Sequence, residues 1–92
     1  MISVVMATYN GEKYIERQLT TLLEQTRRPD EVIICDDVST DNTAQLVQDF
    51  IKEHSLADKW HFSINEKNLG YRKNFAQALA KATGNYIFLA DQ

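Results

Sequence analysis

The amino-acid sequence predicts an α/β fold with a parallel sheet of about four strands and helices on both faces. Short apolar runs rich in β-branched residues alternate with amphipathic stretches of helical period. The resulting order is βαβαβαβ, which favours a parallel sheet because each strand is followed by a helical crossover. The 92 residues include one proline and three glycines and contain no low-complexity tract, so we expect residues 1–92 to form one domain.

The first strand and helix are predicted within the N-terminal 25 residues. "ISVVMA", Ile2 to Ala7, is a continuous apolar run typical of a strand buried on both faces. The Asn-Gly pair in "TYNGEKY" indicates a turn. Helical period then runs from Tyr14 to Gln25 and ends before Pro29, which disfavours an α conformation at Arg28. The apolar side of this helix is formed by Ile15, Leu19, Leu22 and Leu23.

The second strand and helix follow directly. "EVIIC", Glu31 to Cys35, reads as another buried strand, and its cysteine is expected to be a packed thiol rather than a reactive one. In "DDVSTDNT", Ser39 or Thr40 can cap a helix, and Asp41 favours the positive end of that helix. The helix is expected to continue through about His54.

The remaining elements are predicted after residue 59. "WHFSI", Trp60 to Ile64, is the third strand, with the tryptophan in core or edge packing. "YRKNFAQALAKAT" is a helix, residues 71–83, and Gly84 is well placed as its left-handed cap. "NYIFLA", Asn85 to Ala90, is the fourth strand.

Charge and cysteine usage limit the environment and partners. Ten basic and thirteen acidic side chains give a net charge of −3 without any basic block, which argues against a nucleic-acid partner. One cysteine cannot form an intramolecular disulfide, which indicates a reducing compartment. No apolar run reaches the roughly 18 residues that span a bilayer, and the start lacks a basic leader. We expect a cytoplasmic protein.

Polar and acidic residues follow every predicted strand. Ligands of open α/β sheets bind outside the carboxyl ends of the strands, so we expect a binding site at this edge. The residues that the topology brings there are Thr8, Tyr9, Asn10, Glu12, Asp36, Asp37, Asp41, Asn68, Arg72, Lys73, Asn74 and Asp91.

The chemistry of these residues suits a nucleoside diphosphate. Neither GxGxxG nor GxxxxGK[ST] is present, and an acidic pair after strand two rather than strand one argues against a phosphorylated receiver domain. The Tyr9 ring can stack on a base, while Asp36 and Asp37 can accept a ring N–H or ribose hydroxyls. A diphosphate beside carboxylates requires a divalent cation such as Mg²⁺ or Mn²⁺.

Ordinary alternatives exist for several of these residues. Asp41 can be a first-turn helix charge, Asp36 can order the loop after its strand, and Tyr9 can pack against the first helix. Arg72 and Lys73 can be solvated, although a cation near a helix start is unfavourable and therefore favours a ligand-facing role for one of them.

Four segments together resemble the opening of the family 2 glycosyltransferases, enzymes with the Rossmann-like GT-A fold. They are "ISVVMATYNGEKYIERQLTTLLEQT", "PDEVIICDDVSTDNT", "NLGYRKNFAQAL" and "GNYIFLADQ". Their order and spacing match the family, and the resemblance covers essentially the whole chain. The resemblance implies a parent enzyme that transfers a sugar, with inversion, from a UDP- or dTDP-linked donor to a hydroxyl acceptor in polysaccharide or glycoconjugate synthesis. It also implies Mg²⁺ or Mn²⁺ as cofactor.

The resemblance assigns roles to individual positions. Thr8 and Tyr9 match positions at the nucleobase. Asp37 matches the carboxylate that reads the pyrimidine N3–H, with Asp36 beside it. The nucleotide-binding residues expected on this basis, together with their neighbours at the same edge, are Thr8, Tyr9, Asn10, Glu12, Asp36, Asp37, Gly70, Arg72, Asn74 and Asp91.

Asp91 matches the first aspartate of the family's DxD motif and is the expected metal ligand. The sequence stops at "ADQ", one residue before the second aspartate, and the general base of the family lies further downstream. We therefore expect a donor-binding N-terminal half that holds no catalytic residue and is inactive alone. The alternative is a non-catalytic nucleotide-binding or self-assembling module. An exposed edge at "YIFLA" predicts a homo-oligomer.

Two positions depart from the family pattern. Val38 stands where "DDGSTD" has glycine, and Lys73-Asn74-Phe75 stands where "ARN" is commoner. Both resemble a subgroup that builds surface polysaccharides with rhamnose or related sugars.

Overall fold

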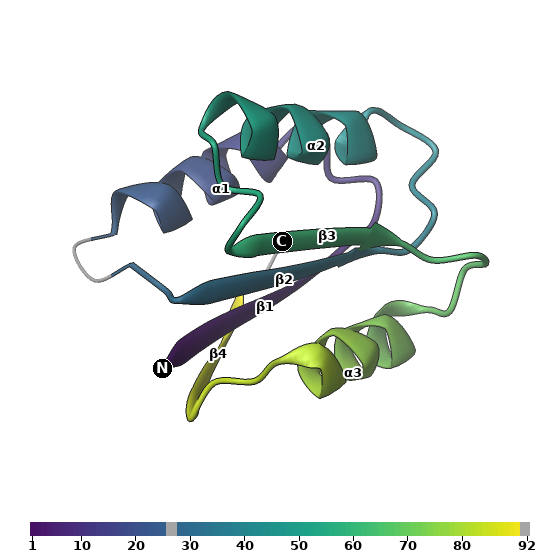
Figure 1. Cartoon of the computed structure of the whole chain (residues 1–92). Coiled ribbons are helices and arrows are strands. Elements are labelled where there is room, and N and C mark those ends of the chain that lie inside the picture. The colour runs from purple at the N-terminus through teal and green to yellow at the C-terminus, as the bar shows by residue number, and fades with distance from the viewer. Residues whose placement is uncertain (26–27, 91–92) are drawn as a thin grey trace.

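The computed structural model describes residues 1–25 and 28–90, and these form a βαβαβαβ unit. Strands and helices alternate as predicted, and Figure 1 shows them in chain order. The bounds are β1 Ile2–Thr8, α1 Ile15–Glu24, β2 Glu31–Asp36, α2 Thr43–Glu53, β3 Trp60–Ile64, α3 Tyr71–Lys81 and β4 Tyr86–Ala90.

The four strands form one parallel sheet in the order β3-β2-β1-β4. Helices α1 and α2 pack together on one face, and α3 covers β1 and β2 on the other (Figure 1). The predicted parallel sheet with helices on both faces is therefore confirmed. Both β1 and β2 run one residue further than predicted, so Thr8 and Asp36 are paired in the register at the carboxyl edge.

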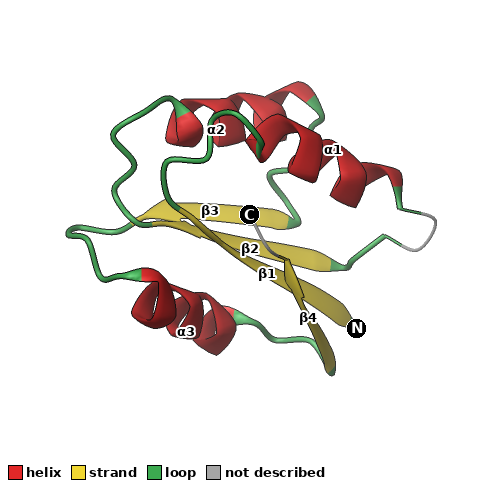
Figure 2. Ribbon diagram, turned by 180° about the vertical axis from the view of Figure 1, so that it is seen from behind, coloured by secondary structure: helices red, strands yellow, loops and turns green. Residues whose placement is uncertain are grey.

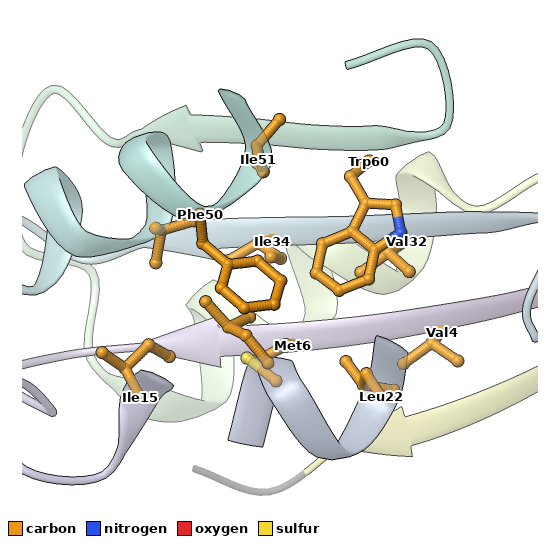
Figure 3. Close-up of a cluster of buried hydrophobic side chains, with 11 residues drawn as sticks. Val4, Met6, Ile15, Leu22, Val32, Ile34, Phe50, Ile51 and Trp60 are labelled. Carbon is orange, nitrogen blue, oxygen red and sulfur yellow. The ribbon is translucent and has the colours of Figure 1, made fainter. Parts of the chain in front are cut away.

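Alternation along the central strands divides the core between the two faces. Successive side chains of a strand point to opposite sides of the sheet. Val4 and Met6 therefore join the larger cluster under α1 and α2, whereas Val5 packs under α3. Figure 3 shows the larger cluster, in which Phe50 stacks on Trp60 with ring centroids 5.7 Å apart. Trp60 thus belongs to the core.

The smaller core face holds the cysteine. Ala78 of α3 is fully buried against Val5, Ile33 and Cys35, with Phe75 at the margin. The small Ala78 side chain allows α3 to lie close to the strands. Cys35 is a buried free thiol, as predicted from its apolar run.

Two helix caps differ from the predictions. Helix α2 begins at Thr43 rather than after Ser39 or Thr40, because the Ser39 hydroxyl donates instead to Asp36 Oδ1, at 2.7 Å. Helix α3 ends at Lys81 on an extended Ala82, so Gly84 is not its left-handed cap.

Gly84 is required for close approach rather than for a turn. An added Cβ would collide with the Ser3 side chain and lie 2.8 Å from the Met1 carbonyl oxygen. The Gly84 N–H donates to Ser3 Oγ at 2.8 Å. The connection from α3 to β4 therefore passes tightly against the start of β1.

Glu31 fastens this amino end of the sheet. Its Oε2 accepts the Ser3 hydroxyl at 2.5 Å and both the N–H and hydroxyl of Thr83, at 2.6 and 2.8 Å. Burial disfavours the charged form of Glu31, but these hydrogen bonds, with a smaller charge effect of His61, outweigh it and lower the pKa of Glu31. A buried carboxylate thus joins β1, β2 and the segment before β4.

Within the described residues, none of the helices is long and apolar enough to cross a membrane.

Candidate nucleotide site

Three loops meet at the carboxyl edge of the sheet and border a cavity of about 660 Å³. They follow β1 and β2 and precede α3, and Figure 2 shows them at the same end of the molecule. The described residues that line the cavity are Ala7, Thr8, Tyr9, Asp37, Val38, Thr40, Asn68, Gly70, Tyr71 and Asn74. The predicted position of the site is therefore occupied by a cavity of ligand size.

Asp36 is fully buried behind the cavity and organises the loop after β2. Its Oδ1 accepts the hydroxyls of Thr8, at 2.6 Å, and Ser39, at 2.7 Å. Its Oδ2 accepts the Ser39 N–H at 2.9 Å. Asp36 already accepts three hydrogen bonds from the protein. It therefore orders the loop after β2, which was one of the roles predicted for it.

Asn10 joins the loops after β1 and β2. Its side-chain Oδ1 accepts the Thr40 N–H at 2.7 Å, and its own N–H donates to Ser39 Oγ at 2.9 Å. The Asn10 φ of 49° lies in the left-handed region that asparagine tolerates better than most residues. Asn10 therefore shapes the wall of the cavity from behind.

A second set of hydrogen bonds joins the same two loops. The Glu12 N–H donates to Asp41 Oδ2 and the Asn42 N–H to Glu12 Oε2, both at 3.2 Å. Asp41 also accepts the Thr43 N–H at 2.9 Å, and the Thr43 hydroxyl accepts the Gly11 N–H at 2.8 Å. Burial opposes ionisation of Asp41, but the donors from Thr43 and Glu12 outweigh it and lower its pKa. Glu12 is thus a loop contact.

Asp37 faces the cavity and is 2% exposed. Its Oδ1 accepts the N–H of Leu69 at 2.7 Å and the side-chain amide of Asn65 at 3.0 Å. Its Oδ2 accepts the Gly70 N–H at 2.9 Å. Burial disfavours the charge, but these donors outweigh it and hold the pKa of Asp37 below its ordinary value. Asp37 is therefore a fixed anion in the cavity wall at neutral pH.

Aromatic rings stand on two sides of the cavity. Tyr9 follows β1 and is 49% exposed, while Tyr71 begins α3 and is 62% exposed. The Tyr71 ring lies edge-on to Phe75, with centroids 5.7 Å apart. Tyr9 was predicted at the site from its turn, whereas Tyr71 was not predicted.

The start of α3 supplies the third side of the cavity. Gly70 has a φ of 89°, which strains any side-chain-bearing residue although no atom lies within 4 Å of an added Cβ. Asn74 is buried, and its Nδ2 donates to the Cys35 carbonyl oxygen at 2.8 Å. Asn74 thus ties α3 to β2, and Gly70 brings its N–H to Asp37.

The structure separates the predicted residues into two groups. The predicted residues that line the cavity are Thr8, Tyr9, Asp37, Asn68, Gly70 and Asn74. The remaining predicted residues with described positions do not line the cavity; they are Asn10, Glu12, Asp36, Asp41, Arg72 and Lys73.

Asp91, the predicted metal ligand, lies outside the described residues. The described part of the chain contains no group of three or more His, Cys, Asp or Glu side chains that could hold a metal ion. Asp36 and Asp37 also have most of their acceptor positions filled by protein donors. The described residues by themselves do not form a metal site.

Sequence reasoning missed Asn65, Gln77 and Tyr71. Asn65 directly follows the predicted third strand, and Gln77 lies in the predicted helix 71–83 and in the segment "NLGYRKNFAQAL", but neither residue was given a role. The one available signal is position: Asn65 follows β3 at the carboxyl edge, and its N–H donates to the Asp36 carbonyl oxygen at 2.9 Å.

Fold and site together define a Rossmann-like α/β protein with a ligand cavity at the carboxyl edge of its sheet. The chain belongs to glycosyl transferase family 2, whose sequence model matches residues 3–92. This confirms the predicted family.

Individual relatives agree with this membership. The chain is 36% identical over 90 residues to the dTDP-rhamnosyl transferase RfbG of Shigella flexneri. The matched region covers 95% of the chain and 31% of RfbG. It matches the mannosyltransferase PcManGT of Pyrobaculum calidifontis, solved in complex with GDP-Man and Mn²⁺, with a TM-score of 0.87 and 28% identity over 98% of the chain and 26% of PcManGT.

A second solved structure is TarS 1–349 of S. aureus in complex with UDP. Its TM-score is 0.83 and its identity 36%, over 98% of the chain and 26% of TarS 1–349. The chain spans about a third of the length of the curated relatives it matches.

Proposed function

We propose that this chain is the donor-binding part of a glycosyltransferase and that its cavity holds the base and ribose of a UDP- or dTDP-linked sugar. The observation that carries the proposal is the buried Asp37 carboxylate in a cavity walled by two exposed tyrosines. Tyrosine faces stack on bases, and an ionised acceptor matches the N3–H of uracil or thymine. The complexes of PcManGT with GDP-Man and of TarS 1–349 with UDP support a nucleoside diphosphate as the ligand.

In the parent reaction we propose, an acceptor hydroxyl oxygen bonds to the anomeric carbon as the bond to the diphosphate oxygen breaks. The hydroxyl proton passes to a general base outside these 92 residues, and the anomeric centre is inverted. Mg²⁺ or Mn²⁺, with Asp91 among its ligands, would supply positive charge to the leaving diphosphate. This chain alone would bind the donor without turning it over.

The subgroup resemblance of Val38 and the identity to RfbG together support a deoxysugar donor linked to dTDP, used in polysaccharide synthesis.

A buried free thiol supports a reducing compartment, the cytoplasm, as the place of action.

Tyr9→Ala tests the proposed base site. We expect titration with UDP or dTDP, with and without Mn²⁺, to show binding that Tyr9→Ala weakens about tenfold or more, because a stacked base is worth about 1–3 kcal/mol. Tyr14→Ala is the matched control, since Tyr14 is also exposed but lies at the start of α1. Absence of nucleotide binding to the folded native chain, or equal loss in both variants, would contradict the proposal.

We also propose that the 92-residue chain forms homo-oligomers through β4. In the described sheet β4 pairs with β1 and stands at the edge, and its Ile87 is 40% exposed. Unpaired edge strands of apolar sequence tend to pair with another chain. A monomeric mass in light scattering at tens of micromolar would refute this.

A further inference from the structure

Three side-chain amides form a connected network behind Asp37. Asn65 Nδ2 donates to Asp37 Oδ1 at 3.0 Å and to Asn74 Oδ1 at 2.9 Å. Gln77 Nε2 donates to Asn65 Oδ1 at 2.7 Å and to Asn74 Oδ1 at 3.3 Å. Asn65 follows β3, whereas Asn74 and Gln77 lie on α3, so the network joins the loop and the helix behind the cavity.

The orientation of every amide in the network is determined by its two ends. The Cys35 carbonyl oxygen only accepts, so Asn74 must present its NH₂ there and its Oδ1 towards Asn65. The Asp37 carboxylate also only accepts, so Asn65 must present its NH₂ to both Asp37 and Asn74. Asn65 Oδ1 is then left to accept from Gln77. No alternative flip satisfies both ends.

Donors from the described part of the chain fill all but one of the acceptor positions of Asp37. An ionised carboxylate has about four lone-pair sites, two on each oxygen. Among residues 1–25 and 28–90, Oδ1 receives two donors, the Leu69 N–H and Asn65, while Oδ2 receives one, the Gly70 N–H. A ligand in the cavity therefore meets a carboxylate that can accept one further hydrogen bond, at Oδ2.

We propose that Asn65 and Gln77 are positioning residues for base selection. They hold Asp37 so that its one remaining acceptor site faces a base whose ring nitrogen carries a proton. Uracil and thymine offer such an N3–H, whereas the N3 of cytosine is itself an acceptor and would oppose the carboxylate. This inference rests on the proposed nucleotide function and adds to it the residues that set the base preference.

The test is the ratio of UDP to CDP affinity, measured by nuclear magnetic resonance titration of the ¹⁵N-labelled 92-residue chain. We expect the native chain to favour UDP by about tenfold or more, because a fixed buried acceptor rejects a base that lacks the donor. Asn65→Ala removes one donor to Asp37 and should lower this ratio about tenfold. Gln77→Leu acts one step further away and should lower it about threefold.

Gln48→Ala is the control, because Gln48 is an exposed amide on α2 and should leave the ratio unchanged. A purely structural role of Asn65 would weaken UDP and CDP equally, and that result overturns the inference while leaving the proposed function intact. A folded native chain that binds neither nucleotide overturns both. Gln77→Leu decides the question if Asn65→Ala does not fold.

Discussion

Val38 occupies a backbone conformation that β-branched residues rarely adopt. Its φ is 62°, directly after Asp37, and its side chain lines the cavity. The left-handed conformation costs an L-residue roughly 1–2 kcal/mol, and such strain tends to be retained at functional sites. The glycine that is usual here in the resembling family pattern would remove that cost. Valine at position 38 therefore differs from the glycine of the family pattern in conformational energy as well as in sequence.

Val38→Gly should raise the free energy of unfolding by about 0.5–1 kcal/mol. The relief of left-handed strain exceeds the extra chain entropy that glycine loses on folding, which is about 0.5–1 kcal/mol. Urea unfolding followed by circular dichroism would measure it. Val38→Ala keeps the Cβ and most of the strain, so it serves as the control. A Val38→Gly chain no more stable than Val38→Ala would show that the strain is absent.

At the scale of elements, the two ends of the sheet are fastened by different carboxylates. Asp37 joins the end of β2 to the loop before α3, and Glu31 joins the start of β2 to β1 and to the segment before β4. Each carboxylate connects segments that are far apart in sequence. The loop contacts of Asn10 and Asp41 then fix α1 and α2 relative to the cavity.

Glu31→Gln should lower the free energy of unfolding at pH 7 by about 1–2 kcal/mol, because charge-assisted hydrogen bonds are roughly twice as strong as neutral ones. Glu66→Gln, an exposed residue of the loop after β3, is a suitable control and should change little. The measurement is urea unfolding of both variants beside the native chain. Equal stability of Glu31→Gln and native protein would mean that the carboxylate contributes no more than an amide.

At the scale of the whole molecule, Glu31, Asp37 and Asp41 share a lowered pKa. A carboxyl group whose folded pKa is depressed stabilises the protein above its unfolded pKa, about 4. That stabilisation is lost as the pH falls through the folded pKa, because the unfolded chain then binds protons that the folded chain does not.

We therefore expect these three groups to keep the free energy of unfolding nearly constant between pH 6 and pH 5. Below about pH 4 they should make it fall steeply. Each carboxyl that takes up a proton only on unfolding contributes a slope of up to about 1.4 kcal/mol per pH unit. Urea unfolding at a series of pH values would test this, and Glu31→Gln should flatten the slope. Stability that is constant down to pH 3 would contradict it.

Much of this protein is determined by local sequence. Apolar runs and helical stripes predicted each of the seven elements in the described part of the chain, because strand and helix periods are local properties of the chain. Topology then placed Thr8, Tyr9 and Asp37 at one edge, since parallel strands bring their carboxyl ends together. Cys35 was likewise predicted to be a packed thiol from its apolar run, and Trp60 was expected in core or edge packing.

Tertiary structure alone decided the finer roles. Ser39 accepts the Asn10 N–H instead of capping α2, and Gly84 is needed for its contact with Ser3 rather than for a turn. Both contacts join segments that are distant in sequence. The same holds for the hydrogen bonds from Asn65 to Asp37 and from Gln77 to Asn65, which exist only after β3 and α3 have packed. Local patterns set where a residue lies along an element, whereas long-range hydrogen bonds set which of its possible partners it finally meets.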